Sequence, residues 1–480
     1  MLHHSAVLPP SWGFLLLLIL GIIWIGLGVY WGRKARNLEG FMLAGRNVGM
    51  GLGVGTVMAT WITSNTTMLA PQFALELGVL GMLAYSTASC GLLLFAPLAK
   101  RLRQLMPHGY TSGDFIRLRY GNGPWAVFLG ISLFYSLTWL VSMGMAGGIL
   151  LNALAGIPYT FGMSALLAVC VTYTVFGGLY AVIGTDFLQS LLILVGIVII
   201  GLGILARTGI EEVYRHMADE TPMLLNMLFP AALLALFNNL LFGVGEIFHS
   251  NVWWSRAFAL QKEIGLKTYL LAGALWIPVP IASGFLALSS GWLDINVIRP
   301  DMVGPLISAH LLGTTGAVVV FILLFCSLAS SLDSLLAATS DLITNDIIKT
   351  WWAPNTCEKS LRHMATWVIL GLGLLTWAIC LPQIGTLATI LFFAGPLVAS
   401  TIWPIATGLY WRHATAQGAL WGMLLGSGGG LLSYWFWGWY TGALVGAAVS
   451  MVVVFITSRT SDTLFQWDQL HEMPKGAAKT

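Results

Sequence analysis

Hydroxyl side chains gather in one apolar segment, residues 303–344. Ser327, Ser330, Ser331 and Ser334 follow one another at i, i+3, i+4 and i+7, so an α-helix would place their oxygens on one face. Hard cations prefer oxygen ligands of this kind. The same hydroxyls could instead bond to carbonyls one turn earlier in their own helix, and this alternative stays open at this point.

A second polar stretch interrupts the apolar residues 48–70. The hydroxyl and amide side chains of residues 60–67 favour a helix poorly, and Pro71 follows, so the helix is expected to unwind locally. Unwinding frees backbone carbonyls, and a cation is one partner that could satisfy them. A kinked helix packed through small residues is the alternative. Transporters with two inverted repeats hold Na⁺ between a broken helix and the other half of the molecule, which would join the two polar stretches.

Ionisable side chains inside apolar segments are costly and mark candidate sites. Asp186 stands between two predicted spans, where it could cap a helix with Thr185 or hold a cation that leaves toward the cytoplasm. Glu246 and His249 are one helical turn apart, so they could share a proton. Alternatively, Glu246 lies near the inner interface and forms a salt bridge with Arg256.

The composition requires a membrane. Of 480 residues, 57% are hydrophobic and 9% are charged, whereas about a quarter of the residues in soluble proteins are charged. No alternating pattern typical of a β-barrel occurs, so the expected fold class is an all-α integral membrane protein with about thirteen transmembrane helices. The predicted spans are 12–32, 48–70, 77–98, 124–155, 159–182, 186–206, 224–250, 266–289, 303–344, 364–381, 384–411, 415–436 and 438–457.

Basic residues predict the orientation. With the N-terminus outside, only Arg207, Arg215 and Arg299 of the 22 Lys and Arg residues fall on the outer side. The C-terminal tail, 458–480, is then cytoplasmic. Span 12–32 is not expected to be a cleaved signal, because its basic cluster follows the apolar run. No basic run suggests nucleic-acid binding.

Enzyme chemistry is not expected. The chain has neither the zinc-protease motif HExxH nor the nucleophile motif GxSxG, and it has no phosphate-binding P-loop. Its five cysteines show no paired spacing, which argues against metal or redox chemistry.

Five segments, in order along the chain, resemble the sodium:solute symporter family. They are FMLAGRNVGMG (41–51), GVGTVMATWITSNTT (53–67), TYTVFGGLYAVIGTDFLQ (172–189), SLASSLDSLLAATSDLITNDIIK (327–349) and GLYWRHATAQGALWGMLLG (408–426). The resemblance implies one membrane domain with the inverted-repeat fold shared with LeuT. An extra N-terminal helix (12–32) would precede a first repeat of five helices (48–206), a second repeat (224–411) and two C-terminal helices (415–457).

The resemblance also implies a sodium site. Its ligands would be the backbone carbonyls of Ala59, Ile62 and Ser327 and the side-chain hydroxyls of Ser330 and Ser331. Ser327 stands where the family often has Ala, a change that should matter little because that ligand is a carbonyl. Asp186 matches the position of the family's aspartate on the inner cation path.

The solute is expected to be small, polar and nitrogenous. Residues 78–121 and 253–276 are similar to the urea-active branch of the family, which points to a urea-like solute, a polyamine or an amino acid. The expected substrate-binding residues are Trp61, Thr63, Thr66, Tyr85 and Glu246. Trp61 could instead be a core residue, and Thr66 and Tyr85 stand where sugar transporters have Gln and Glu, which disfavours a sugar.

The resulting prediction is a Na⁺-driven symporter in a bacterial inner membrane, with the solute and the lipid bilayer as its partners and no obligate protein partner. Three alternatives remain. The protein could be proton-coupled, could carry a monocarboxylate or proline, or could be a nutrient sensor that keeps a transporter fold.

Overall fold

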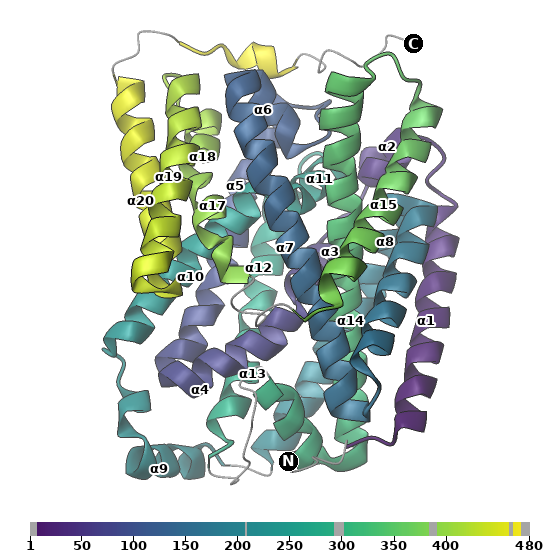
Figure 1. Ribbon diagram of the computed structural model, residues 1–480, viewed down its shortest axis with the longest axis vertical. Helices are drawn as coiled ribbons and strands as arrows, with labels where there is room; N and C mark the ends of the chain where they lie inside the picture. Colours follow the sequence, from purple (N-terminus) through teal and green to yellow (C-terminus); the bar gives the residue numbers. More distant parts are fainter. Residues whose placement is uncertain (1–6, 207–208, 292–301, 384–390, 460–463, 472–480) are drawn as a thin grey trace.

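The computed structural model describes residues 7–206, 209–291, 302–383, 391–459 and 464–471, and the regular elements in these ranges are helices (Figure 1). In the first half they are α1 (Pro10–Gly32), α2 (Leu38–Leu43), η1 (Ala44–Arg46), α3 (Met50–Trp61), α4 (Ser64–Ser86), η2 (Thr87–Ser89), α5 (Cys90–Leu105), α6 (Ser112–Tyr120), α7 (Asn122–Ala155), α8 (Tyr159–Leu205), α9 (Ile210–Glu220) and η3 (Pro222–Leu225). In the second half they are α10 (Pro230–His249), α11 (Asn251–Ala259), α12 (Gly265–Trp276), α13 (Pro278–Leu288), α14 (Val303–Leu342), η5 (Ile343–Trp352), α15 (Glu358–Cys380), α17 (Gly395–Ser400), α18 (Ile402–Tyr410), α19 (Ala416–Trp437), α20 (Trp439–Arg459) and η6 (Trp467–His471).

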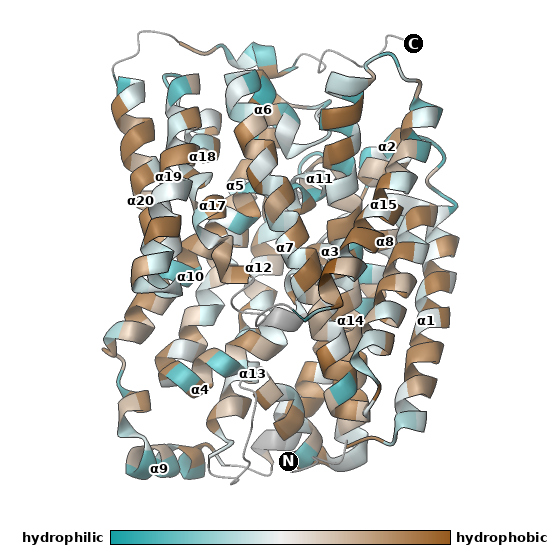
Figure 2. Ribbon diagram, in the orientation of Figure 1, coloured by the Kyte–Doolittle hydropathy of each residue, from teal (hydrophilic) through white to brown (hydrophobic). Residues whose placement is uncertain are grey.

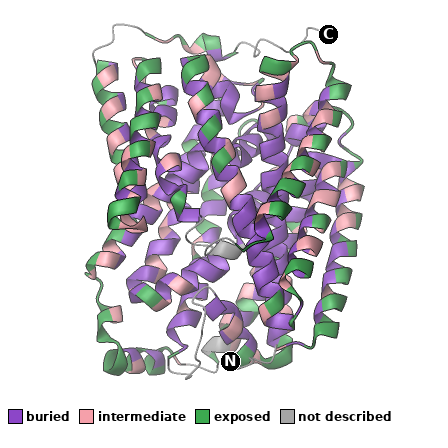
Figure 3. Cartoon of the chain, in the orientation of Figure 1, coloured by how far each residue is buried: buried purple, intermediate pink, exposed green. Residues whose placement is uncertain are grey.

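The helices form one elongated bundle with an apolar flank. Hydrophobic residues colour the shafts of the helices, and hydrophilic ones gather toward the two ends (Figure 2). The outer helices present large apolar side chains: Leu18 and Ile22 of α1 are 61% and 63% exposed. Buried residues concentrate in the central helices, while α1, α15, α19 and α20 carry the exposed faces (Figure 3). A surface this apolar is suited to lipid, as predicted from the composition.

The first and last spans have their outer ends at opposite ends of the bundle. α1 begins at the end that carries α9, and α20 finishes at the other end (Figure 1). This arrangement agrees with termini on opposite sides of the membrane. Which side is cytoplasmic stays a prediction, and two of the three basic residues assigned to the outer side, Arg207 and Arg299, lie outside the described residues.

The predicted count of thirteen spans is not confirmed. By length and composition, ten helical segments in the described ranges could cross a membrane. The predicted spans 159–182 and 186–206 lie in one of these segments, which is kinked at Gly178, where the backbone is not helical. Similar kinks occur at Gly78 in α4 and at Gly313 in α14. The limits of the two repeats stay predictions. Residues 384–390 of span 384–411 and most of the tail 458–480 lie outside the described part.

Glycines bring α1 and α8 into close contact. A Cβ added to Gly177 would lie 2.4 Å from the Cα of Gly32, far inside van der Waals distance. The next residue, Gly178, has φ +52°, a conformation that residues with a Cβ rarely adopt. The backbones therefore approach closely at these two glycines, which fixes the part of α8 that precedes Asp186.

Candidate functional site

The first helix break separates α3 from α4. α3 ends at Trp61, and Ile62 leaves the helical region with φ −82° and ψ 81°. Thr63 then caps α4: its hydroxyl accepts a hydrogen bond from the Thr66 N–H at 3.2 Å, while the Thr66 hydroxyl accepts one from the Thr63 N–H at 3.3 Å. This reciprocal capping box starts a new helix immediately after the old one ends. The predicted local unwinding is therefore confirmed.

The break leaves two of the predicted carbonyl ligands without a backbone hydrogen-bond partner among the described residues. The carbonyl of Trp61 accepts from Trp276 Nε1 at 2.7 Å and from Thr66 Oγ1 at 3.2 Å. In the described part of the chain, no backbone N–H donates to the carbonyls of Ala59 or Ile62. Buried carbonyls usually have partners, so the donor set at this break fits a cation.

A second break, which the sequence did not predict, separates α10 from α11. α10 ends at His249, Ser250 is extended with φ −70° and ψ 126°, and α11 begins at the next residue. The Trp254 Nε1 donates to the carbonyl of Phe248 at 2.6 Å, which satisfies one of the carbonyls freed at the end of α10. The predicted span 224–250 ends at this residue, but the sequence did not predict that a second helix begins directly after it.

The serine face of α14 lies against α3 and α8. The Ser331 hydroxyl donates to the carbonyl of Thr60 at 3.2 Å, and it also lies 3.0 Å from the carbonyl of Ser327 in its own helix. The Ser330 hydroxyl donates to Asp186 Oδ1 at 2.5 Å. Only the Ser327 hydroxyl bonds solely within its helix. The face thus joins the end of the broken helix to a buried carboxylate.

Asp186 is a fully buried residue inside α8 and caps no helix. It lies well within Tyr159–Leu205, because the non-helical residue in this stretch is Gly178 rather than a residue beside Thr185. Its Oδ2 accepts from Thr56 Oγ1 at 2.5 Å and from Arg256 Nη2 at 3.1 Å. The predicted N-cap role is therefore wrong, and the cation-path role stays a prediction.

Arg256 of α11 is the cation that pairs with Asp186. The side chain is 1% exposed. Its Nη2 also lies 2.8 Å from Thr60 Oγ1 and 2.6 Å from Ser334 Oγ, and its Nε donates to Thr56 Oγ1 at 3.0 Å. One guanidinium therefore connects α11 to α3, α8 and α14. A buried ion pair of this kind is stable only when its remaining polar atoms are also hydrogen-bonded, as they are here.

A second buried carboxylate, Asp333, adjoins this network. It accepts from the hydroxyl of Tyr173 at 2.7 Å and from Ser334 Oγ at 3.2 Å. Tyr173 belongs to α8, so Asp333 forms another polar link between α8 and α14.

Glu246 is buried and is bonded to an indole. Trp253 Nε1 lies 3.2 and 3.3 Å from its two carboxylate oxygens. His249 Nδ1 lies 2.8 Å from the carbonyl of Gly245, and among the described residues its Nε2 has no hydrogen-bond partner. The predicted proton-sharing pair of Glu246 and His249 is not formed, because the imidazole bonds back to its own helix. The alternative salt bridge to Arg256 is also wrong, because Arg256 pairs with Asp186.

An aromatic cavity lies beside the first break. The Trp61 ring packs at 6.1, 5.4 and 5.8 Å from the rings of Trp139, Trp253 and Trp276. Within the described part of the chain, Trp61 Nε1 has no hydrogen-bond partner. The cavity is lined by Trp61, Thr63, Thr66, Tyr85, Ala88, Tyr135, Trp139, Asn239, Phe242, Trp276, Leu391 and Phe392. It thus collects four of the five predicted substrate residues. The fifth, Glu246, does not line it but bonds to Trp253, whose ring packs against that of Trp61.

Known proteins with this arrangement are transporters. The profile of the sodium:solute symporter family matches residues 41–426. The chain belongs to this family. The match covers most of the chain, including both helix breaks, the serine face and Asp186, and it agrees with the resemblance found in the sequence.

Curated relatives of this symporter-family chain carry different solutes. It is 26% identical over 427 residues to a urea-proton symporter of Oryza sativa subsp. japonica, covering 81% of this chain and 59% of the relative. It is 24% identical over 474 residues to a urea active transporter of Saccharomyces cerevisiae, covering 89% and 63%. These two relatives are much longer than the chain. A sodium/pantothenate symporter of Escherichia coli is 26% identical over 434 residues, covering 84% of this chain and 87% of the relative.

Solved structures show the same fold. A Na⁺-coupled sialic acid symporter in a substrate-bound, outward-open state aligns with a TM-score of 0.79 at 16% identity, over 95% of this chain and 98% of that one. A nucleobase-cation-symport-1 family transporter aligns with a TM-score of 0.58 at 14% identity, over 89% and 96%. The all-helical LeuT-type architecture predicted for the family member is therefore confirmed.

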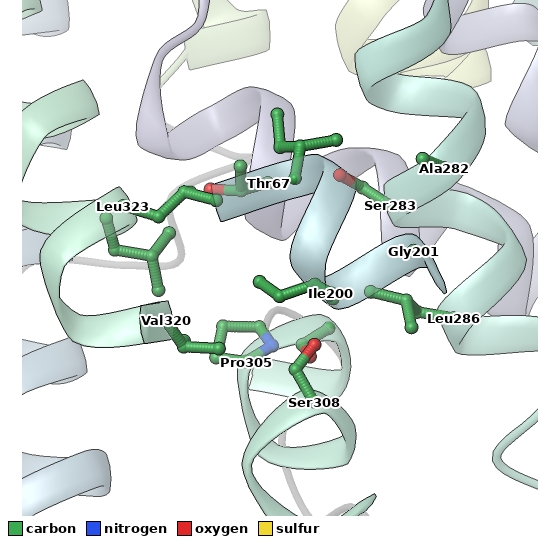
Figure 4. A pocket seen from close by; sticks show the side chains of 13 residues that line it. Thr67, Ile200, Gly201, Ala282, Ser283, Leu286, Pro305, Ser308, Val320 and Leu323 are labelled. Atoms are coloured by element: carbon green, nitrogen blue, oxygen red, sulfur yellow. The ribbon is translucent and has the colours of Figure 1, made fainter. Parts of the chain in front are cut away.

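A second cavity contains none of the predicted site residues. It lies between α4, α8, α13 and α14, and the labelled side chains that surround it are mostly aliphatic, with hydroxyls from Thr67, Ser283 and Ser308 (Figure 4). None of the described residues that line it is charged. It offers little to recognise a polar solute.

Arg256 is the main residue that sequence reasoning assigned wrongly. It was assigned to the cytoplasmic loops, yet a buried Asp186 requires a positive partner, and Arg256 is the basic residue nearest to the second break. Asp333 was noted only as an ionisable residue of the hydroxyl-rich span, and Thr56 and Tyr173 were given no role. All three lie in the segments that resemble the family, but only the packing of α3, α8 and α14 brings their polar atoms together.

Proposed function

We propose that this chain is a symporter that couples the inward flux of Na⁺ to the uptake of a small polar nitrogenous solute, in a bacterial inner membrane with its N-terminus outside. The observation that carries the proposal is the contact between the Ser331 hydroxyl and the Thr60 carbonyl, 3.2 Å apart. It brings the two predicted halves of the sodium site together: the carbonyls of Ala59 and Ile62 on one side, and α14 on the other.

The hydrogen bonds of the two serines support a role as cation ligands. Each hydroxyl proton already points to an acceptor: that of Ser330 to Asp186, and that of Ser331 to the carbonyls of Thr60 and Ser327. A hydroxyl oxygen whose proton is engaged in this way still has lone pairs for a cation. Na⁺ would then hold α3 against α14, and coupling would follow from its different affinity for the outward-open and inward-open states.

The aromatic cavity supports the solute class. Trp61 Nε1 is a buried donor without an acceptor among the described residues, so it suits a carbonyl oxygen. The carboxylate of Glu246 does not line the cavity, but it bonds to Trp253, which packs against Trp61, so its negative charge close to the cavity would favour N–H groups or a positive charge. A urea, an amide or an amine with a nearby carbonyl offers both a carbonyl oxygen for Trp61 and N–H groups or a positive charge for Glu246. Two of the relatives are described as urea transporters, which favours the same class.

Proton coupling is the second candidate. The relative from Oryza sativa is described as a urea-proton symporter. This chain also buries Glu246 with no salt-bridge partner among the described residues, and a carboxylate in that setting can carry a proton.

A thermal-shift screen of the purified protein tests the proposal. Ureas, amides, amino acids and polyamines are added in NaCl or in choline chloride, each at two pH values. One class of nitrogenous solute should raise the Tm. Less of this solute should be needed for the same rise in NaCl than in choline chloride. Equal stabilisation in NaCl and choline chloride at both pH values would reject Na⁺ coupling. Stabilisation that depends on pH and not on Na⁺ would favour the proton candidate.

A further inference from the structure

We propose that the C-terminal end of α1 binds the phosphate of an anionic phospholipid, in a cavity that α1 shares with α8. This cavity is separate from the proposed ion and solute sites. The inference goes beyond the proposed function, because it holds for Na⁺ coupling and for proton coupling alike.

The cavity is lined by three basic side chains and two tyrosines. Its empty volume is about 820 Å³, and the lining residues are Tyr30, Arg33, Lys34, Arg36 and Tyr180. Tyr30 belongs to the last turn of α1, the basic residues follow directly after this helix, and Tyr180 comes from α8. Arginine and lysine together are typical ligands of phosphate groups, and basic pockets between transmembrane helices bind lipid headgroups.

The three positive charges have no acidic partner in the described part of the chain. None of the ion pairs between described residues includes Arg33, Lys34 or Arg36, and all three side chains are exposed. Lys34 Nζ lies 3.9 Å from the centroid of the Trp31 ring. This contact orders the ammonium group but does not neutralise its charge. An anion from outside the chain can therefore balance these residues.

The position of the cavity favours a lipid over a free phosphate ion. α1 and α8 run side by side along one flank of the bundle (Figure 1). Both present apolar side chains there: Ile22 of α1 is 63% exposed and Phe176 of α8 is 53% exposed. Tyr30 and Trp31 follow, as expected for aromatic residues at the headgroup level. A phospholipid with its acyl chains on this flank would bring its phosphate to the basic residues.

The cavity adjoins a contact that a bound headgroup would reinforce. Gly32, the last residue of α1, meets Gly177 of α8 with almost no space between the backbones. Arg362 of α15 donates to the carbonyl of Arg36 at 3.2 Å, which attaches the segment after α1 to a third helix. A headgroup held by the basic residues of this segment and by Tyr180 would bridge α1 and α8. Lipid binding should therefore raise the Tm.

The test is a lipid titration of the delipidated protein in detergent, followed by the Tm. Phosphatidylglycerol should raise the Tm of the parent in a saturable way, and phosphatidylcholine with the same acyl chains should not. In the triple variant Arg33→Gln, Lys34→Gln and Arg36→Gln, the half-saturating concentration of phosphatidylglycerol should rise roughly 100-fold, because each basic residue near a headgroup contributes to binding. An equal response to the two lipids in the parent would overturn the proposal.

A matched control separates this cavity from the general positive charge of the predicted cytoplasmic side. The variant Lys262→Gln, Lys267→Gln and Arg412→Gln loses the same charge from other exposed segments, and none of these residues belongs to an ion pair between described residues. Its half-saturating concentration should match that of the parent. Equal weakening in the two triple variants would show that phosphatidylglycerol recognises net charge and would overturn the cavity.

Two further arms complete the test. Inorganic phosphate and glycerophosphate, added to the parent, should not reproduce the rise in Tm. Stabilisation by either to the same extent as by phosphatidylglycerol would assign the cavity to a soluble phosphate compound and overturn the lipid.

If the triple variant at the cavity does not insert, Arg33→Lys with Arg36→Lys decides. This variant keeps the charges that orient α1 but removes both planar guanidinium groups, so phosphatidylglycerol should bind severalfold more weakly. A parental half-saturating concentration in this variant would then contradict the proposal.

Discussion

Ser330 and Ser331 have the same chemistry but different partners. Ser330 donates to the carboxylate of Asp186, and Ser331 donates to a carbonyl at the end of α3. Replacing either serine by alanine should weaken Na⁺ binding by about 1–3 kcal/mol, or roughly 5- to 150-fold in the Na⁺ half-saturation of uptake, because one oxygen ligand is lost. High Na⁺ should partly restore uptake.

Ser340→Ala is the matched control. Ser340 is equally buried in α14, but its hydroxyl donates to the carbonyl of Ala365, away from the breaks. Its Na⁺ half-saturation should match that of the parent. If all three alanine variants keep the parental Na⁺ dependence, the sodium site does not include these hydroxyls.

Glu246 can be tested for solute selection. Glu246→Gln removes the charge but keeps an oxygen that can accept from Trp253 Nε1, so the fold should survive. The ranking of solutes in competition uptake should shift from cationic toward neutral nitrogenous compounds, while the Na⁺ half-saturation moves little, because the carboxylate contacts Trp253 and none of the predicted sodium ligands. A uniform loss of uptake for every solute would return Glu246 to a purely structural role.

Among the elements, the contact between α1 and α8 depends on glycine. Gly177→Ala would place a Cβ 2.4 Å from the Cα of Gly32, so the helices must separate, at a cost of about 1–3 kcal/mol. The Tm should fall. Gly201→Ala in the same helix meets no atom within 4 Å, so its Tm should stay the same or rise. Equal Tm values for the two variants would contradict this packing.

The two helix breaks show what sequence reasoning can find at this scale. The first break, between α3 and α4, is indicated in the sequence by hydroxyl and amide residues and a nearby proline. The structure contains this break. The second break is held by the Ser250 cap and the indole of Trp254, which bonds to a carbonyl of the preceding helix. Neither Ser250 nor Trp254 stands out in an apolar sequence, so the sequence alone does not mark this break. The pairing of Asp186 with Arg256, 70 residues apart, likewise follows from tertiary packing and not from a local pattern.

For the whole molecule, the composition was sufficient to predict an all-helical membrane protein. The number of spans was not, because the chain kinks at glycines such as Gly178, and hydropathy does not show whether the helices on the two sides of a kink cross the membrane separately. Orientation can be tested through Cys357, which is exposed directly before α15. The segment that leads into α15 lies at the end of the bundle where α20 finishes (Figure 1). A backbone hydrogen bond from Ser360 lowers the pKa of its thiol, which favours reaction with maleimides.

An impermeant maleimide should label Cys357 in inside-out vesicles and not in intact cells, because this loop is predicted to be cytoplasmic. The described residues Cys170, Cys326 and Cys380 are buried and should react slowly. A Cys357→Ser variant gives the background. Labelling of intact cells that disappears in this variant would reverse the predicted orientation.

The most direct test of the account is solute uptake into proteoliposomes under separate ion gradients. The vesicles are loaded with K⁺, and a labelled solute identified by the thermal-shift screen is added outside. An inward Na⁺ gradient at equal pH should drive transient accumulation above the equilibrium level, and a Na⁺ ionophore should abolish it. Accumulation driven by an inward proton gradient in Na⁺-free buffer, with no response to Na⁺, would contradict Na⁺ as the coupling ion.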